Sequence, residues 1–95
     1  MYIGETIVMP SGDIYMMGAM DRADSSVDDS FLLKLSGDGS FQWLKTYGLA
    51  TSTSIYIYQF DKTGDGFVGV GTVSTSVYTI KINLEGELVG QSKYL

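Results

Sequence analysis

The 95-residue chain contains two copies of one sequence unit, and this repeat constrains the fold more than any other feature. The first copy occupies about residues 5–48 and the second about residues 53–95. A unit of about 50 residues is the size of one four-stranded β-propeller blade. The clearest aligned pairs are Gly12 with Gly64, Gly18 with Gly71, Lys34 with Lys81, Gly39 with Gly86 and Tyr47 with Tyr94.

The composition predicts an all-β protein that forms a single domain over residues 1–95. Twelve glycines and many β-branched and aromatic residues favour strands joined by turns. Apolar residues do not recur at helical spacing over any long window. The acidic stretch Asp21–Asp29 is predicted as the longest loop, and it absorbs the difference in length between the two copies. The eight predicted strands are Glu5–Met9, Asp13–Met20, Ser30–Leu35, Ser40–Tyr47, Thr53–Phe60, Gly66–Val73, Val77–Asn83 and Glu87–Tyr94.

One predicted strand indicates how the units pack. Its alternation places Ile55 and Ile57 on one side and Tyr56, Tyr58 and Phe60 on the other. Both sides are apolar or aromatic, so the strand needs cover on both faces. Antiparallel propeller-blade-like units that stack against their neighbours would provide that cover.

The first unit resembles the β-propeller repeat, often called the SBBP repeat, of bacterial and ciliate surface proteins. The segments that carry the resemblance are Ile7–Gly18, Asp29–Leu35 and Gly39–Gly48. They match a Gly turn and strand, a D-x-f-l-x-K-l strand, and a G-x-x-x-W-x-k-x-y-G segment. The second unit departs at Gly90 and Leu95, where the pattern has Trp and Gly. The resemblance implies a propeller-type fold and an extracellular or cell-surface location, but no particular function.

Two blades cannot close a propeller, which needs four to eight. Three explanations stay open. The chain is a piece of a longer protein with further blades, it assembles with copies of itself into a ring or fibre, or the units form a small sandwich. We expect an incomplete propeller that is completed by self-assembly.

The terminal strands are the predicted contacts. Left uncovered, they would offer unpaired backbone groups and apolar side chains to another chain. We expect them to pair with a second copy or with further blades, and Pro at Val8 or Val89 to shift the population toward monomer. The candidate self-association residues are Ile7, Val8, Leu88, Val89 and Tyr94.

Composition also argues against several functions. The chain has no Cys and no His, which removes thiolate nucleophiles, the usual zinc ligands and the usual general base. Six scattered Lys and Arg residues and a net charge of -5 argue against nucleic-acid binding. No apolar run approaches the length of a membrane helix. We therefore expect a non-enzymatic protein without a cofactor, a catalytic residue or a transition metal.

The sequence offers carboxylate oxygens as candidate ligands for calcium. The segment Asp61–Gly66, which contains Asp61 and Asp65, resembles the first half of a calcium loop, but Thr72 and not Glu stands at the twelfth position. We interpret this segment as a hairpin turn. Asp28 and Asp29 form the second candidate pair.

The alternative function is a lectin-like, carbohydrate-binding propeller module. Aromatic rings stack on sugars, although in such folds they more often fill contacts between blades. The candidate aromatic residues are Trp43, Tyr56, Tyr58, Tyr78 and Tyr94.

Overall fold

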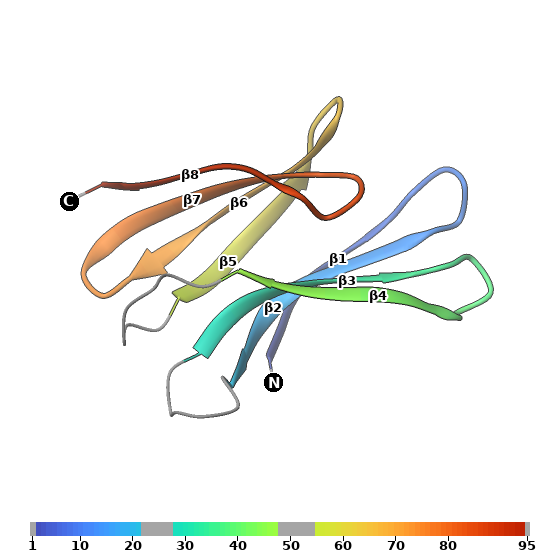
Figure 1. Ribbon diagram of the computed structural model, residues 1–95, viewed down its shortest axis with the longest axis horizontal. Coiled ribbons are helices and arrows are strands. Elements are labelled where there is room, and N and C mark those ends of the chain that lie inside the picture. The colour runs from blue at the N-terminus through green and yellow to red at the C-terminus, as the bar shows by residue number, and fades with distance from the viewer. Residues whose placement is uncertain (1, 22–27, 48–54, 95) are drawn as a thin grey trace.

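A computed structural model of the protein describes residues 2–21, 28–47 and 55–94, and these residues form an all-β fold of two four-stranded antiparallel sheets (Figure 1). In each sheet the strands are neighbours in the order of the chain. The first sheet comprises β1 (Tyr2–Val8), β2 (Ile14–Asp21), β3 (Asp28–Leu35) and β4 (Phe41–Tyr47). The second comprises β5 (Ile55–Lys62), β6 (Gly66–Val73), β7 (Ser76–Asn83) and β8 (Leu88–Tyr94).

All eight predicted strands are present, but the predicted acidic loop is too long. Asp21 ends β2 and pairs with Asp28, the first residue of β3. Asp29 also lies within β3. The ladder therefore extends into both ends of the acidic stretch, and the rest of the predicted loop, residues 22–27, lies outside the described residues.

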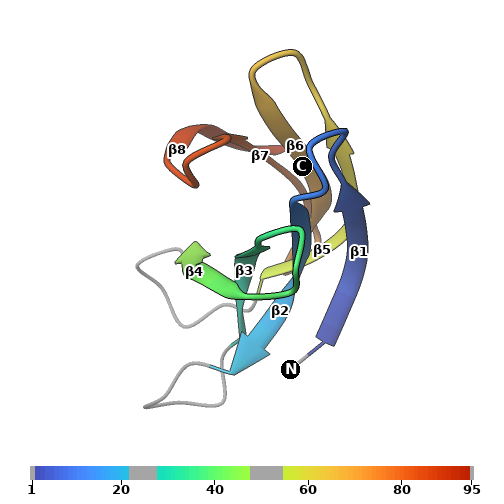
Figure 2. The ribbon, with the colours of Figure 1, turned by 90° about the vertical axis from the view of Figure 1, so that its right-hand side faces the viewer.

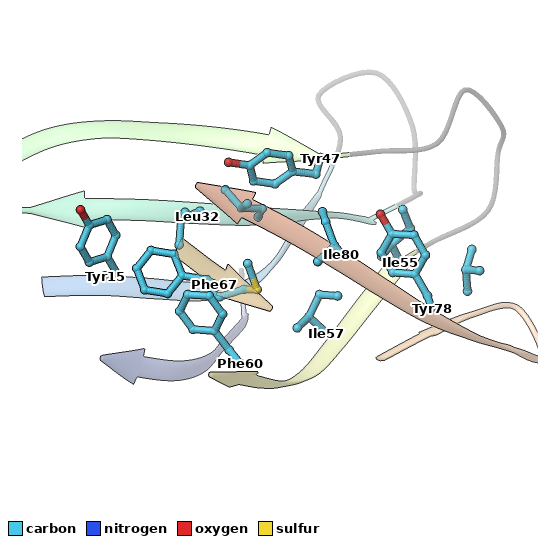
Figure 3. Close-up of a cluster of buried hydrophobic side chains, with 12 residues drawn as sticks. Tyr15, Leu32, Tyr47, Ile55, Ile57, Phe60, Phe67, Tyr78 and Ile80 are labelled. Carbon is cyan, nitrogen blue, oxygen red and sulfur yellow. The ribbon is translucent and has the colours of Figure 1, made fainter. Parts of the chain in front are cut away.

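The hydrophobic core lies between the two sheets. Strand β5 crosses the first sheet and contacts β1, β2 and β3. The Phe67 ring lies 4.6 Å from the Tyr15 ring of the other sheet and 4.8 Å from the Phe60 ring. Figure 3 shows the cluster, whose buried members are Tyr15, Met17, Leu32, Tyr47, Ile55, Ile57, Phe60, Phe67, Val73, Tyr78, Ile80 and Ile82.

Phe60 is on the opposite side of β5 from the predicted one. The pairing with β6 shifts register between Ile57 and Gln59, so Tyr58 is an extra residue in a β-bulge. The bulge reverses the alternation that follows it. Phe60 therefore lies on the same side as Ile57 and is buried, whereas Tyr58 is exposed.

A glycine allows the two sheets to approach closely. A Cβ atom at Gly69 would lie 3.2 Å from the Met17 Sδ of the first sheet and 3.2 Å from the Ile57 Cγ2. The missing side chain leaves room for Met17 to pack between β5 and β7.

The two repeats use opposite faces in this contact. We call the side of each sheet that carries Leu33 or its aligned residue Ile80 the front, and the side that carries Leu32 or its aligned residue Thr79 the back. Leu32 and Ile80 are both fully buried in the core. The front of the second sheet therefore packs on the back of the first. Figure 2 shows the same relation, since both sheets run in the same order from their last strand, at left, to their first strand, at right.

Candidate interaction surface

The front of the first sheet is an apolar face. The first sheet covers the front of the second, but no sheet of the described residues covers the front of the first. The pairing of β1 to β4 places its side chains together, with Met16 opposite Leu33 and Leu33 opposite Leu44. Phe31 on the same side is fully buried and does not belong to the exposed part. The exposed and half-buried apolar residues of this face are Ile3, Val8, Ile14, Met16, Met20, Leu33, Leu35, Phe41 and Leu44, and its polar residues include Thr6, Asp29 and Thr46.

The exposed fractions of aligned residues in the two repeats show how much of this face is uncovered. Ile3 pairs with Gly18, and Ile57 pairs with Gly71, so the two isoleucines occupy the same place in the repeat. The Ile3 side chain is 49% exposed, whereas Ile57 is 3% exposed because the first sheet covers it. An exposed apolar face of this kind is typical of a binding surface.

The back of the second sheet is the second uncovered face, and it is more polar. Val70 is 42% exposed here, whereas the aligned Met17 on the back of the first sheet is 1% exposed. One row across this face, in register from β5 to β8, consists of Tyr56, Thr72, Val77 and Tyr94.

The covered contact between the sheets also contains a polar docking element. The turn between β7 and β8 lies against the back of the first sheet. There the Tyr15 hydroxyl donates to the Leu84 carbonyl at 3.2 Å, Lys45 Nζ to the Glu85 carbonyl at 2.8 Å, and the Tyr47 hydroxyl to the Gly86 carbonyl at 2.5 Å. Burial raises the pKa of Tyr47 well above its usual range, which keeps the hydroxyl protonated as a donor.

Tyr47→Phe should measure what this docking bond contributes. Removing the hydroxyl leaves the Gly86 carbonyl without its partner, so we expect the free energy of unfolding to fall by about 1–2 kcal/mol. Urea unfolding followed by circular dichroism gives the value. Tyr58→Phe is the matched control, because its exposed hydroxyl lies at the limiting distance of 3.5 Å from Thr72 Oγ1, and it should change stability by less than about 0.5 kcal/mol. Equal effects of the two substitutions would contradict the assignment.

The predicted self-association residues lie at several places and do not form one patch. Ile7 is half-buried and packs against the core. Val8, Leu88, Val89 and Tyr94 are exposed. Among the described residues β1 pairs only with β2, and β8 pairs only with β7, so both terminal strands have a free edge. The two edges lie at opposite corners of the molecule (Figure 2).

The predicted sugar-binding aromatics divide into two groups. Tyr78 is buried in the core, where its hydroxyl donates to Gln91 Oε1 at 2.6 Å, and Trp43 is half-buried with its ring 6.2 Å from that of Tyr15. Tyr56, Tyr58 and Tyr94 remain exposed, Tyr56 and Tyr94 as members of the row across the back of the second sheet.

The two candidate calcium pairs lie in different parts of the fold. Asp61 and Asp65 are exposed at the ends of β5 and the following turn, and the Thr63 hydroxyl donates to Asp65 at 3.3 Å. Asp28 and Asp29 are adjacent in β3. In the part of the chain that the structure describes, no three Asp or Glu side chains lie close enough to hold a metal ion together.

Of the front of the first sheet, only Val8 was among the predicted self-association residues, and it was predicted for the free edge of its strand. The signal for this face is present in the sequence as alternate apolar residues in the segments Ile14–Met20 and Leu33–Leu35. The register between strands is needed to show that these residues share a face. The packing of the sheets is needed to show that the first sheet contacts the second through its back and not through this front.

No protein-family model, curated protein or solved structure matches the chain. Residues 2–21, 28–47 and 55–94 include no helix that is long and apolar enough to cross a membrane.

Proposed function

We propose that the protein is a non-enzymatic, structural interaction protein of the β-propeller type that self-assembles into a ring or fibre. Each sheet acts as one blade. The observation that carries the proposal is the front-to-back packing of two aligned repeats. Among residues 2–21, 28–47 and 55–94, it leaves the front of the first sheet and the back of the second sheet uncovered. A second copy offers both missing partners.

Front-to-back packing and the packing of a closed two-sheet sandwich leave different pairs of faces uncovered. If the two repeats buried the same face against each other, both uncovered faces would be alike and the unit would be complete. Opposite faces instead form a heterologous contact, which either closes a ring or continues as a fibre. The free front also keeps the apolar character of the buried one, since Ile3 and Leu33 align with Ile57 and Ile80.

The size of the face sets the expected affinity. Four strands of seven residues span about 19 by 23 Å, so one stacked face covers about 450 Å². Stable protein interfaces bury about 800 Å² per partner. We therefore expect association with a dissociation constant on the order of micromolar, and an assembly that depends on concentration.

Pairing between the free edges of β1 and β8 is a second route to the same assembly. It stays a prediction, and Val8→Pro and Val89→Pro test it because each would interrupt an edge ladder. An extracellular or cell-surface location is also part of the proposal, and it rests on the resemblance to β-propeller repeats of surface proteins.

Carbohydrate binding is the alternative function, and the exposed Tyr56, Tyr58 and Tyr94 favour it. Their rings are accessible, whereas Trp43 and Tyr78 are engaged in packing. A glycan array at high protein concentration tests this function, and an array without any binder would oppose it.

The mass of the protein in solution tests the main proposal. Light scattering from about 1 to 500 μM should show a mass that rises with concentration. Ile3→Asp should remain folded, because the site is half exposed, and should stay monomeric across this range because a charge would enter the stacked face. A wild-type protein that is a folded monomer throughout would overturn the proposal.

A further inference from the structure

We propose that one specific hydrogen bond orients the contact between copies: the Tyr94 hydroxyl of one copy donates to the Gly39 carbonyl of the next. This inference rests on the proposed self-assembly and assigns the partner as a second copy of this chain. The turn Ser36–Ser40 of that second copy docks on the back of the second sheet.

The contact inside the chain is the template. There the turn Asn83–Glu87 of the second sheet lies on the back of the first, and the Tyr47 hydroxyl donates to the Gly86 carbonyl at 2.5 Å. In the repeat, Tyr47 aligns with Tyr94 and Gly86 aligns with Gly39. Both aligned partners are exposed, one on each sheet.

The two turns have the same backbone form. In each, the glycine amide donates to a carbonyl three residues earlier, at 2.9 Å from Gly39 to Ser36 and at 3.0 Å from Gly86 to Asn83. Both glycines adopt positive φ, +88° and +83°, a conformation that L side chains rarely adopt. The turn Ser36–Ser40 is therefore already shaped as the docked turn is.

Side-chain hydrogen bonds hold the free turn in this shape. The Asp38 carboxylate accepts the Ser36 hydroxyl and the Ser40 amide, at 2.5 and 2.9 Å. These bonds, the first most strongly, lower the pKa of Asp38 to about 2. In the docked turn the Asn83 side-chain oxygen accepts the Glu85 and Glu87 amides. A side-chain oxygen therefore holds the last amide of both turns, Ser40 in one and Glu87 in the other. Order that exists before binding reduces the entropy cost of docking.

Tyr94 occupies the place that the donor needs. Tyr47 lies opposite Ser30 in the first sheet, and Tyr94 lies opposite Val77, the residue aligned with Ser30, in the second. Both tyrosines are therefore on the back of their sheets. The difference is cover, since Tyr47 is buried and Tyr94 is 56% exposed.

The apolar residues around this bond are also complementary between copies. Inside the chain, the bulky Met17 on a back packs over Gly69 on a front. Between copies, the aligned residues are Val70 on the back and Met16 on the front. Inside the chain the larger side chain, Met17, is on the back, whereas between copies the larger side chain, Met16, is on the front. Both pairs can fill the same spacing between sheets without a void.

Tyr94→Phe tests the bond. Loss of one hydroxyl should weaken association about 3- to 10-fold, measured by light scattering or sedimentation, and leave the unfolding midpoint unchanged. Thr63→Ala is the control, because it removes a hydroxyl from the turn between β5 and β6, and it should leave the association constant unchanged. An association constant unaltered by Tyr94→Phe would overturn the inference but leave self-assembly, which the wild-type mass establishes separately.

Thiol cross-linking locates the contact, and the chain suits it because it has no Cys of its own. Tyr94→Cys and Ser40→Cys proteins, mixed with a short bismaleimide that spans the length of the replaced tyrosine side chain, should form a covalent dimer that neither forms alone. A mixture of Tyr94→Cys with Asp65→Cys is the control, since Asp65 lies in a turn outside the proposed contact. Cross-linking of Tyr94→Cys protein alone, or equal trapping in both mixtures, would overturn the assignment.

Discussion

Ile57→Asp should leave the chain unfolded. Ile57 is 3% exposed, and its Cγ2 lies next to Gly69, where Met17 of the first sheet also packs. The substitution removes a buried apolar side chain, which costs about 2–5 kcal/mol, and adds a carboxylate without a partner. Domains of this size have only about 5–15 kcal/mol of stability in total. Circular dichroism and dispersed amide signals in nuclear magnetic resonance spectra measure the outcome.

Ile3→Asp is the matched control for this prediction. It makes the same chemical change at the same place in the repeat, but at a side chain that is 49% exposed. We expect a folded protein with a melting temperature within a few degrees of wild type. If both variants unfold, the front of the first sheet is part of the fold itself and not a free face.

The strands could be predicted from the sequence because their signals are local. Gly-containing turns and β-branched or aromatic segments determine where a strand begins and ends, and Gly66–Val73 was predicted at the observed bounds. The acidic stretch was predicted less well, because pairing continued through residues of low strand propensity. Asp21 and Asp28 belong to the ladder because the neighbouring pairs already hold the two strands together.

The faces could not be predicted from alternation alone. A single extra residue at Tyr58 reverses the alternation. Phe60 was predicted on the same side as Tyr56 and Tyr58, but it lies on the side of Ile57, in the core. Which side of a sheet meets its neighbour depends on packing over many residues. The repeat alignment supplies the missing step. Leu33 aligns with Ile80, but Ile80 is buried in the contact between the sheets whereas Leu33 lies on the uncovered front of the first sheet, so the two repeats use opposite faces in that contact.

The candidate site followed from the sequence only in part. Tyr94 was predicted as a self-association residue, and it lies exposed on the back of the second sheet. Its role there was predicted from the free edge of a terminal strand, whereas the structure adds the aligned pair Tyr47 and Gly86 as a template for a contact through the face. Ile3 and Val70 were not predicted, since their exposure depends on which faces are covered.

Mixing two variants that are each monomeric should produce a dimer that does not grow. Ile3→Asp blocks the front of the first sheet, and Val70→Asp blocks the back of the second. Each variant keeps one working face but lacks the complementary one, so neither can associate with itself. In the mixture, the free back of Ile3→Asp meets the free front of Val70→Asp, which gives one contact per pair and none beyond it.

Sedimentation and native mass spectrometry distinguish this result from the other arrangements, with one variant labelled to separate the masses. A symmetric contact between two fronts would let Val70→Asp dimerise alone. Pairing between the edges of β1 and β8 would let both variants assemble as the wild type does, since neither substitution interrupts a ladder. A dimer that appears only in the mixture, and at a ratio of one to one, requires a contact between two different faces, and this is the relation that the two repeats already have within the chain.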